Sequence, residues 1–270
     1  MGVDHSGTCK RINHDSKLRV LSLFAGIGGF DLGLERTGGF ETVAFCEIEP
    51  YAQKVLAKHW PKVPIYEDVR TISSSILRSD GITIDVIVGG FPCQDISSQG
   101  FQAGITGERS GLWSEIARLA GELRPKIIIV ENVSALLGNG MGTVLGDLAS
   151  LGYDAEWHCI PASYLGASHE RDRVWIIAHP AEINGGETIG EGSNLLAQRI
   201  ARECAKIRGT AFCEHEGKST IWLDGQSALC SKNDGLPYTL VKSQLERYGN
   251  AVVPQIPEAI GNAILERMAA

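Results

Sequence analysis

The sequence predicts an α/β domain built on an open, mostly parallel sheet, and two observations support this fold class. From Leu18 onward, short apolar runs alternate with helical patterns, and most of these runs end in polar or glycine-rich turns, as buried parallel strands do. Two further runs follow late in the chain without a long helix between them, which indicates a late strand pair in an open sheet. The expected strands are Val20–Phe24, Thr42–Cys46, Ile84–Val88, Lys126–Val130, Glu156–Pro161 and Arg173–Ala178.

Local signals place helices between and after these strands. Pro50 can start a helix that runs to His59, because the fixed φ of proline suits the first helical position. Apolar residues recur with helical spacing over Leu112–Leu123, which predicts a helix with one buried face. The other expected helices are Met141–Leu151, a segment around Leu195–Ile207, and Pro257–Met268.

Periodicity divides the chain into four parts. Residues 1–17 are polar and aperiodic, so we expect a tail there. Residues 18–178 carry the regular pattern of strands and helices. The pattern weakens over residues 179–243, which indicates a small inserted domain or a long functional loop, and it returns over residues 244–270.

Composition and charge exclude several classes of protein. The chain has 270 residues, of which 43% are hydrophobic, and this suits one globular domain with at most a small appendage. The seven cysteines are odd in number and form no CxxC pair, so we expect reduced thiols in a cytoplasm and no zinc site. The absence of a long apolar run argues against a membrane span. The net charge of −7 argues against a uniformly basic surface but is compatible with a local basic cleft that binds nucleic acid.

A glycine-rich turn follows the first expected strand. Phe24–Phe30 contains Gly26, Gly28 and Gly29, which allow a sharp turn from strand to helix and a close approach to a ligand. Glu47 lies 19 residues after Gly28, close to the spacing of about 20 expected for an acid that binds a ribose. A carboxylate at Asp68, in the third turn, could accept from an adenine amino group.

Three interpretations of this turn remain open. The glycines could simply close a tight turn, or they could bind a nicotinamide cofactor. The spacing is GxGG, however, and a third glycine facing a pyrophosphate is not evident. An adenosine ligand without phosphates, such as S-adenosylmethionine, fits the turn at least as well.

A second turn places a thiol at a strand end. Ile84–Val88 leads into Gly89, Gly90, Phe91, Pro92 and Cys93, so the thiol is expected at the carboxyl end of a sheet strand, where ligands bind in α/β sheets. Proline before the cysteine restricts the backbone and sets the direction of the thiol. The following residues, 94–107, are rich in Gly, Gln and Ser, as expected for a lid. The alternatives are a buried small hydrophobe or a redox sensor, but a nearby resolving cysteine is missing from the sequence.

Together these segments resemble the cytosine-C5 DNA methyltransferase family, with its motifs in the same order along the chain. The matching segments are Phe24–Gly29, Glu47, Asp68, Gly90–Gln94, Glu131–Val133, Arg171–Arg173 and Arg247–Val252. The resemblance implies a class I methyltransferase (Rossmann-like) sheet with a small target-recognition insertion. It makes residues 18–178 the catalytic and cofactor-binding domain and residues 179–243 a short target-recognition region. Residues 244–270 would then return to the catalytic domain.

The resemblance also implies a mechanism. Cys93 would attack C6 of a cytosine that has been flipped out of the duplex, and C5 would then take the methyl group of S-adenosylmethionine. Glu131 would contact N3 and the exocyclic amine of the ring. Arg171 and Arg173, which face the same side if they lie on a strand, would hold the O2 atom. The simpler alternatives are an N-cap or ion-pair role for Glu131, and a surface ion pair of the arginines with Asp172 or Glu170.

The resemblance extends to the remaining ligands. The implied cofactor-binding residues are Phe24, Ala25, Gly26, Gly28, Glu47, Ile48, Asp68, Val69, Pro92, Leu112, Asn250 and Ala251. The implied DNA-binding residues are Gln94, Ser97, Ser98 and Arg109. We therefore expect double-stranded DNA as the partner, no metal, a monomer, and a role in restriction-modification or phage DNA protection in the cytoplasm of a prokaryotic cell.

Two departures from the family pattern keep alternatives open. His169 stands where the family commonly has glutamine, and the region expected to recognise the target has only about 60 residues. We expect His169 to tune the activity only, whereas the short region leaves open a module that binds cofactor and DNA without turnover. The resemblance itself also leaves open a methyltransferase acting on tRNA. A nicotinamide-dependent oxidoreductase would leave the Pro-Cys turn and the arginine pair unexplained.

Overall fold

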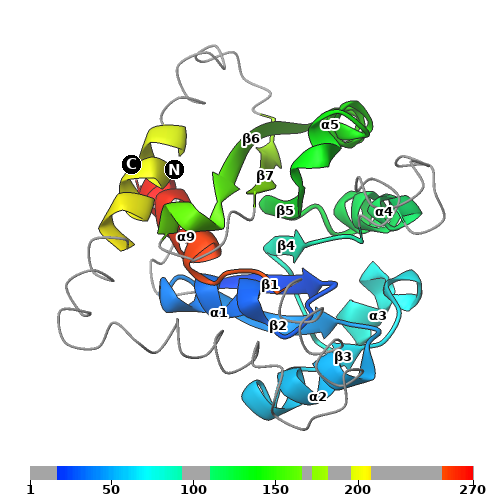
Figure 1. Cartoon of the computed structure of the whole chain (residues 1–270). Helices are drawn as coiled ribbons and strands as arrows, with labels where there is room; N and C mark the ends of the chain where they lie inside the picture. The colour runs from blue at the N-terminus through cyan, green and yellow to red at the C-terminus, as the bar shows by residue number, and fades with distance from the viewer. Residues whose placement is uncertain (1–16, 93–109, 166–171, 182–195, 208–250, 270) are drawn as a thin grey trace, which may run out of the picture.

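The computed structural model describes residues 17–92, 110–165, 172–181, 196–207 and 251–269. Within these ranges a seven-stranded sheet has the order β3-β2-β1-β4-β5-β7-β6. Neighbouring strands are parallel except at β7, which is antiparallel to both β5 and β6 (Figure 1). The predicted open, mostly parallel α/β sheet is therefore confirmed. The strands are β1 Leu18–Leu23, β2 Phe40–Cys46, β3 Ile65–Tyr66, β4 Val86–Gly89, β5 Ile127–Val133, β6 Tyr153–Pro161 and β7 Asp172–Pro180.

Helices follow most of the strands. The α-helices labelled in Figure 1 are α1 Gly29–Arg36, α2 Pro50–His59, α3 Ser74–Ser79, α4 Trp113–Leu123, α5 Met141–Ser150 and α9 Gln255–Ala269. Residues 196–207 form a further helix. Short 3-10 helices are η1 Val69–Thr71, η3 Ser110–Leu112, η4 Ser134–Leu137 and η5 Ala162–Leu165. The helix predicted from Pro50 to His59 has the observed bounds, whereas β3 and α3 are too short to leave a periodic pattern in the sequence.

Strand β5 is longer than its sequence pattern indicated. The apolar run ends at Val130, but the strand continues through Glu131 and Asn132 to Val133. These last residues extend beyond β4, and their backbone pairs with the antiparallel strand β7 alone. The expected strand Lys126–Val130 therefore ends three residues too early, and Glu131 lies within β5. A hydrogen-bonding neighbour, which hydrophobicity does not reveal, keeps this polar segment extended.

Two apolar layers cover the two faces of the sheet. Alternate residues of β5 enter different layers: Ile128 packs with the cluster beneath α3, α4 and α5, and Ile129 packs with the cluster beneath α1, α9 and residues 196–207. Figure 1 shows these two groups of helices on opposite sides of the sheet. Each fully buried Leu or Ile side chain in such a layer is worth about 1.5–3 kcal/mol of folding free energy.

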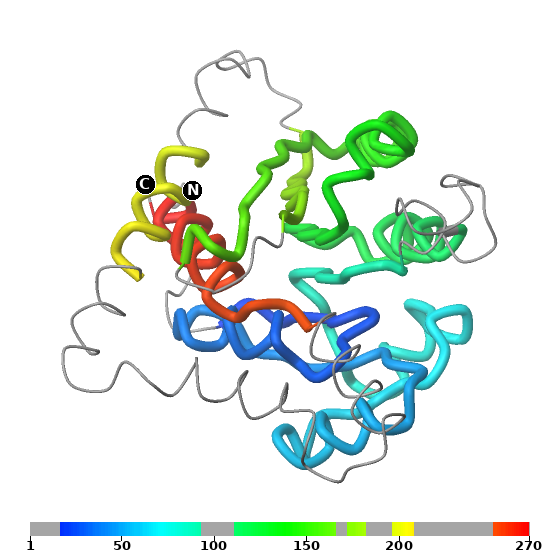
Figure 2. Tube along the Cα trace, in the orientation of Figure 1, coloured from blue at the N-terminus to red at the C-terminus, as the bar shows by residue number. Residues whose placement is uncertain are grey.

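The C-terminal segment returns to the first helix. Figure 2 shows the chain before α9 running back over the N-terminal elements. A Cβ atom on Gly29, the first residue of α1, would lie only 2.3 Å from the carbonyl oxygen of Val252. Glycine at this position therefore permits the backbone of residues 251–254 to rest directly on the start of α1. The sequence positions 29 and 252 are thereby brought into contact beside the glycine-rich turn.

Candidate active site

The turns predicted to carry function gather along one edge of the sheet. β1, β2, β3 and β4 are parallel, so the turns that follow them lie at the same edge, their carboxyl ends. The strand order changes direction between β1 and β4, since β2 and β3 lie on one side of β1 while β4 and β5 lie on the other. In open α/β sheets, ligands bind in the crevice outside the carboxyl ends at such a switch point.

The glycine-rich turn after β1 is tied to the end of β2. The backbone N–H of Gly26 donates to Oε2 of Glu47 at 2.6 Å, and the Ala25 N–H donates to the carbonyl of Cys46 at 3.2 Å. Oε1 of Glu47 accepts from the N–H of Glu49 at 2.9 Å. Glu47 thus fixes the conformation of the turn, and Gly28 forms the N-cap of α1. Both carboxylate oxygens retain acceptor capacity, because each has accepted one hydrogen bond from the backbone.

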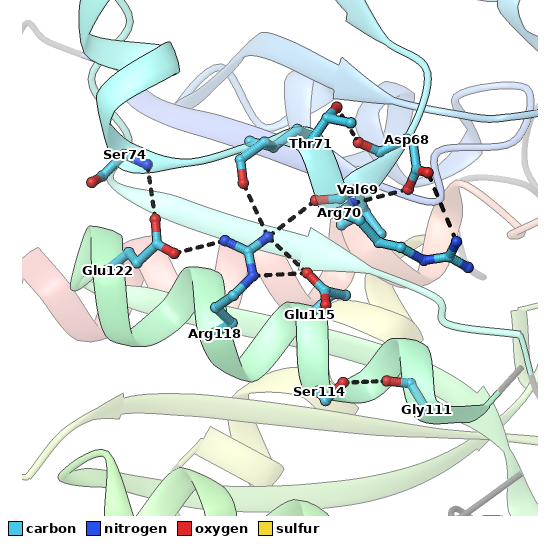
Figure 3. A network of polar contacts seen from close by, with 11 residues as sticks. Asp68, Val69, Arg70, Thr71, Ser74, Gly111, Ser114, Glu115, Arg118 and Glu122 are labelled. Atoms are coloured by element: carbon cyan, nitrogen blue, oxygen red, sulfur yellow. Dashed lines mark hydrogen bonds and ion pairs between the residues drawn. The ribbon is translucent and has the colours of Figure 1, made fainter. Parts of the chain in front are cut away.

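The turn after β3 presents Asp68 at the same edge. One side-chain oxygen of Asp68 accepts from the N–H of Arg70 at 2.9 Å, which caps η1, and the side chain is 34% exposed (Figure 3). Val69, which the resemblance assigns to cofactor binding, has its side chain in the apolar core. Ile48 lies close in sequence to Glu47 and is 65% exposed. The second and third turns therefore combine carboxylates with one exposed apolar side chain.

The turn after β4 is held against β5. The buried amide of Asn132 donates to the carbonyl of Phe91 at 3.2 Å, one residue before Pro92. A Cβ atom on Gly90 would lie 2.9 Å from Oε2 of Glu131, so the carboxylate of Glu131 rests on the backbone of this turn. Glycine at position 90 therefore makes room for an acidic side chain next to the segment that leads into Cys93.

Glu131 and Arg173 form an ion pair across β5 and β7. The Nε atom of Arg173 lies 2.9 Å from Oε1 of Glu131, and the two side chains are 20% and 11% exposed. The ion-pair role considered for Glu131 is therefore present, with Arg173 as its partner. Arg173 contacts Asp172 through the backbone carbonyl at 2.9 Å, whereas Glu170 and Arg171 lie outside the described residues. A nearly buried carboxylate and a guanidinium stand side by side at the carboxyl end of β5, where each can also face a ligand.

A buried carboxyl group lies beneath the first turn. Asp31, on α1, is fully buried and accepts hydrogen bonds from the hydroxyls of Ser22 on β1 and Thr42 on β2, each at 3.0 Å. Burial raises the pKa of Asp31 to about 7, although both hydrogen bonds act in the opposite direction. The sequence analysis did not single out this residue. The only available signal was an acidic residue in a stretch whose apolar neighbours belong to the core.

Several predicted site residues lie outside the described residues. They are Cys93, Gln94, Ser97, Ser98, Arg109, Arg171 and Asn250. Most of the region expected to recognise the target, residues 182–195 and 208–243, also lies outside them. Those that the structure does bring together at the sheet edge are the glycine turn with Glu47, and Glu131 with Arg173. Within the described residues, no group of three or more His, Cys, Asp or Glu side chains could hold a metal ion. The helices of this described part include none that is long and apolar enough to cross a membrane.

Comparison with known proteins connects this site to one family. The family described as C-5 cytosine-specific DNA methylase matches residues 18–209. This range contains the glycine turn, both carboxylate turns, the Pro-Cys turn and the Glu131–Arg173 pair.

Type II methyltransferases are among the relatives that match a large part of the chain. The type II methyltransferase M2.BsuMI of Bacillus subtilis is 38% identical over 169 residues, which cover 60% of this chain and 42% of that protein. The type II methyltransferase M.Eco47II of Escherichia coli is 38% identical over 208 residues, which cover 74% of this chain and 49% of that protein. The chain thus spans about half the length of the curated relatives it matches.

Solved structures agree with the fold. The S. pombe Dnmt2 methyltransferase superimposes with a TM-score of 0.52 at 20% identity, covering 66% of this chain and 54% of that one. At this identity the likeness concerns the arrangement of the sheet and helices alone, and it agrees with the open, mostly parallel sheet that the sequence predicted.

Proposed function

Because this chain belongs to the family of C-5 cytosine-specific DNA methylases, we propose that it transfers the methyl group of S-adenosylmethionine to C5 of cytosine in double-stranded DNA. The observation that carries the proposal is the Glu131–Arg173 pair, which rests on the Gly90 turn leading into Cys93. A thiol, an acid and a guanidinium suit a reaction that places charge on a pyrimidine ring. By analogy with the type II methyltransferases it matches, the biological role is protection of DNA in restriction-modification.

Use of S-adenosylmethionine is general in this family, and the residues at the sheet edge fit its adenosine part. Glu47 has free acceptor capacity for ribose hydroxyls, and the partly exposed carboxylate of Asp68 can accept from the adenine amine. The exposed side chain of Ile48 offers apolar surface to the adenine ring. The other proposed contacts are Phe24, Ala25, Gly26, Gly28, Val69, Pro92, Leu112, Asn250 and Ala251. When bound, the sulfonium supplies the methyl group that C5 takes up.

Cys93 begins the proposed reaction. Its thiolate attacks C6 of cytosine, a sulfur–carbon bond forms, and the electron pair of the 5,6 double bond moves to C5. C5 would then take the methyl group from S-adenosylmethionine held by Glu47 and Asp68, which would be left as a thioether. Water, as the candidate base, would take the proton from C5, which restores the 5,6 double bond and releases the thiolate of Cys93.

Glu131 and Arg173 stabilise the ring while it carries extra electron density. Glu131 contacts N3 and the exocyclic amine, and Arg173 donates to O2, where negative charge also develops. The ion pair between them holds the carboxylate in place before the base arrives. Arg171 would face the same side as Arg173 if the extended conformation of β7 continues to it. In the proposal, the DNA strand that carries the flipped base is bound by Gln94, Ser97, Ser98 and Arg109.

The proposal is tested with 5-fluorocytosine DNA. Fluorine at C5 cannot leave as a proton does, so the enzyme should remain covalently attached through Cys93 in a complex that survives denaturant. Cys159, which is exposed on β6, provides the matched control. Cys93→Ser should abolish the adduct and Cys159→Ser should leave it intact.

A second measurement addresses the alternatives. Bisulfite sequencing of DNA from cells that express the chain should show methylcytosine within a fixed sequence. Methylation confined to tRNA, or cofactor binding without any adduct or methylcytosine, would overturn the proposed activity.

A further inference from the structure

Arg118 lies on α4 and contacts the segment that follows β3, residues 69–72. Its guanidinium donates to Glu115 at 2.8 Å and to Glu122 at 2.6 Å, both on the same helix. The Nη2 atom also donates to two backbone carbonyls, those of Val69 at 3.1 Å and Ile72 at 3.0 Å (Figure 3). One side chain therefore ties α4 to both ends of η1.

Glu122 extends the same contact along the chain. While one of its oxygens accepts from Arg118, the other accepts from the backbone N–H of Ser74 at 2.9 Å, at the start of α3. The pKa of Glu122 is lowered, first by this backbone hydrogen bond and then by Arg118, against the opposing effect of burial. Figure 3 shows the guanidinium between the two carboxylates, facing the backbone of residues 69–74.

This segment has little regular structure of its own. β3 has 2 residues, η1 has 3 and α3 has 6, and helices this short are not stable alone. The apolar side chains of Val69 and Ile72 hold the segment from the core side. Polar contacts of Arg118 and Glu122 with its backbone join the segment directly to α4.

We propose that Arg118 is a positioning residue for cofactor binding, because it sets where the turn carrying Asp68 stands relative to the start of α4. Asp68 directly precedes the carbonyl of Val69 that Arg118 holds, and Leu112 directly precedes α4. The guanidinium of Arg118 thus links the turn that carries Asp68 to the helix that follows Leu112, and both residues are proposed cofactor contacts. This inference rests on the proposed function, since it assigns the turn to S-adenosylmethionine.

Arg118→Lys is the sharpest variant. Lysine keeps the charge and an ion pair with an acidic neighbour, but a single ammonium cannot reproduce the planar fork that serves two carboxylates and two carbonyls at once. Arg36→Met is the matched control. Arg36 lies in the last turn of α1, and within the described residues its ion-pair partner is Glu258, at 3.5 Å. Exposed pairs of this kind contribute about 0–1 kcal/mol to stability.

The test measures binding of S-adenosylhomocysteine by calorimetry and steady-state kinetics on the full chain. For Arg118→Lys we expect Kd and the KM for S-adenosylmethionine to rise about tenfold, which corresponds to about 1.4 kcal/mol. The kcat at saturating cofactor should change less than twofold, and Arg36→Met should leave Kd unchanged. A lower Tm with unchanged Kd and KM would show a purely structural role and overturn the proposal.

A second variant and the unsubstituted chain complete the test. If Arg118→Lys does not fold, Glu122→Gln replaces it, since it weakens the anchor of the guanidinium while keeping the size of the side chain. An increase in Kd of a few fold would support the proposal, and an unchanged Kd would refute it. If the unsubstituted chain itself fails to bind S-adenosylhomocysteine, the proposed function fails, and the role of Arg118 fails with it.

Discussion

Replacing Asp31 by asparagine should make the protein more stable at and above neutral pH. The carboxyl group is fully buried between α1, β1 and β2, and its only described side-chain donors are the neutral hydroxyls of Ser22 and Thr42. An ionised carboxylate in this position loses the solvation it has in water and gains no countercharge from either donor. Asparagine has nearly the same shape, and its amide can accept from one hydroxyl and donate to the other.

The magnitude follows from the pKa of Asp31. Burial raises it from 3.8 to about 7, and each pKa unit is worth about 1.36 kcal/mol. Below about pH 4 the carboxyl is protonated in both the folded and the unfolded state, so it does not change the free energy of unfolding. Between about pH 4 and 7 the unfolded chain releases the proton while the folded chain keeps it, and stability falls as pH rises. Above pH 7 the full cost applies, about 4 kcal/mol on this arithmetic.

The assay is urea unfolding followed by circular dichroism between pH 5 and pH 8. Over this range Asp31 should lower the free energy of unfolding of the unsubstituted chain by about 2–3 kcal/mol, and Asp31→Asn should remove that part of the slope. Glu41→Gln, at an exposed position of β2, is the control and should leave the slope in place. If Asp31→Asn and the unsubstituted chain lose stability in parallel from pH 5 to pH 8, the buried carboxyl does not titrate as argued.

Three further predictions concern the sheet edge. Gly90→Ala should leave stability nearly unchanged but lower kcat by roughly 10²-fold, because the new methyl group displaces the carboxylate of Glu131; methyl transfer at full activity would contradict this. Gly29→Ala should lower the free energy of unfolding by about 1–3 kcal/mol in denaturant titration, because the methyl group meets the backbone carbonyl of Val252; an unchanged value would show that residues 251–254 do not pack there. Burial, together with Glu47 and Asp68, raises the pKa of Cys46 to about 12, so iodoacetamide at pH 8 should alkylate the exposed Cys159 and spare Cys46, as read by peptide mass spectrometry. Equal labelling of the two would contradict the buried position of Cys46.

The local pattern of the sequence was sufficient for the class of fold and for the order of its motifs. Apolar runs with helical segments between them predicted the sheet, and Pro50 marked the observed start of α2. Turn-forming residues after the strands marked the edge that holds the candidate site, because glycine permits backbone conformations that other residues rarely adopt and proline fixes φ, whatever the surrounding sequence. The resemblance built on these turns agrees with the family match over residues 18–209.

Only the tertiary structure decided which of these residues meet. β5 runs on through Glu131 because β7 pairs with it, and the same pairing sets Arg173 2.9 Å from a carboxylate 42 positions earlier in the chain. Gly90 leaves space for that carboxylate, and Arg118 holds carbonyls of a segment that precedes it by more than 40 residues. Contacts of this kind depend on how strands pair and helices pack. Propensity and periodicity depend on a residue's neighbours along the chain, so they do not predict which residue it contacts across the sheet.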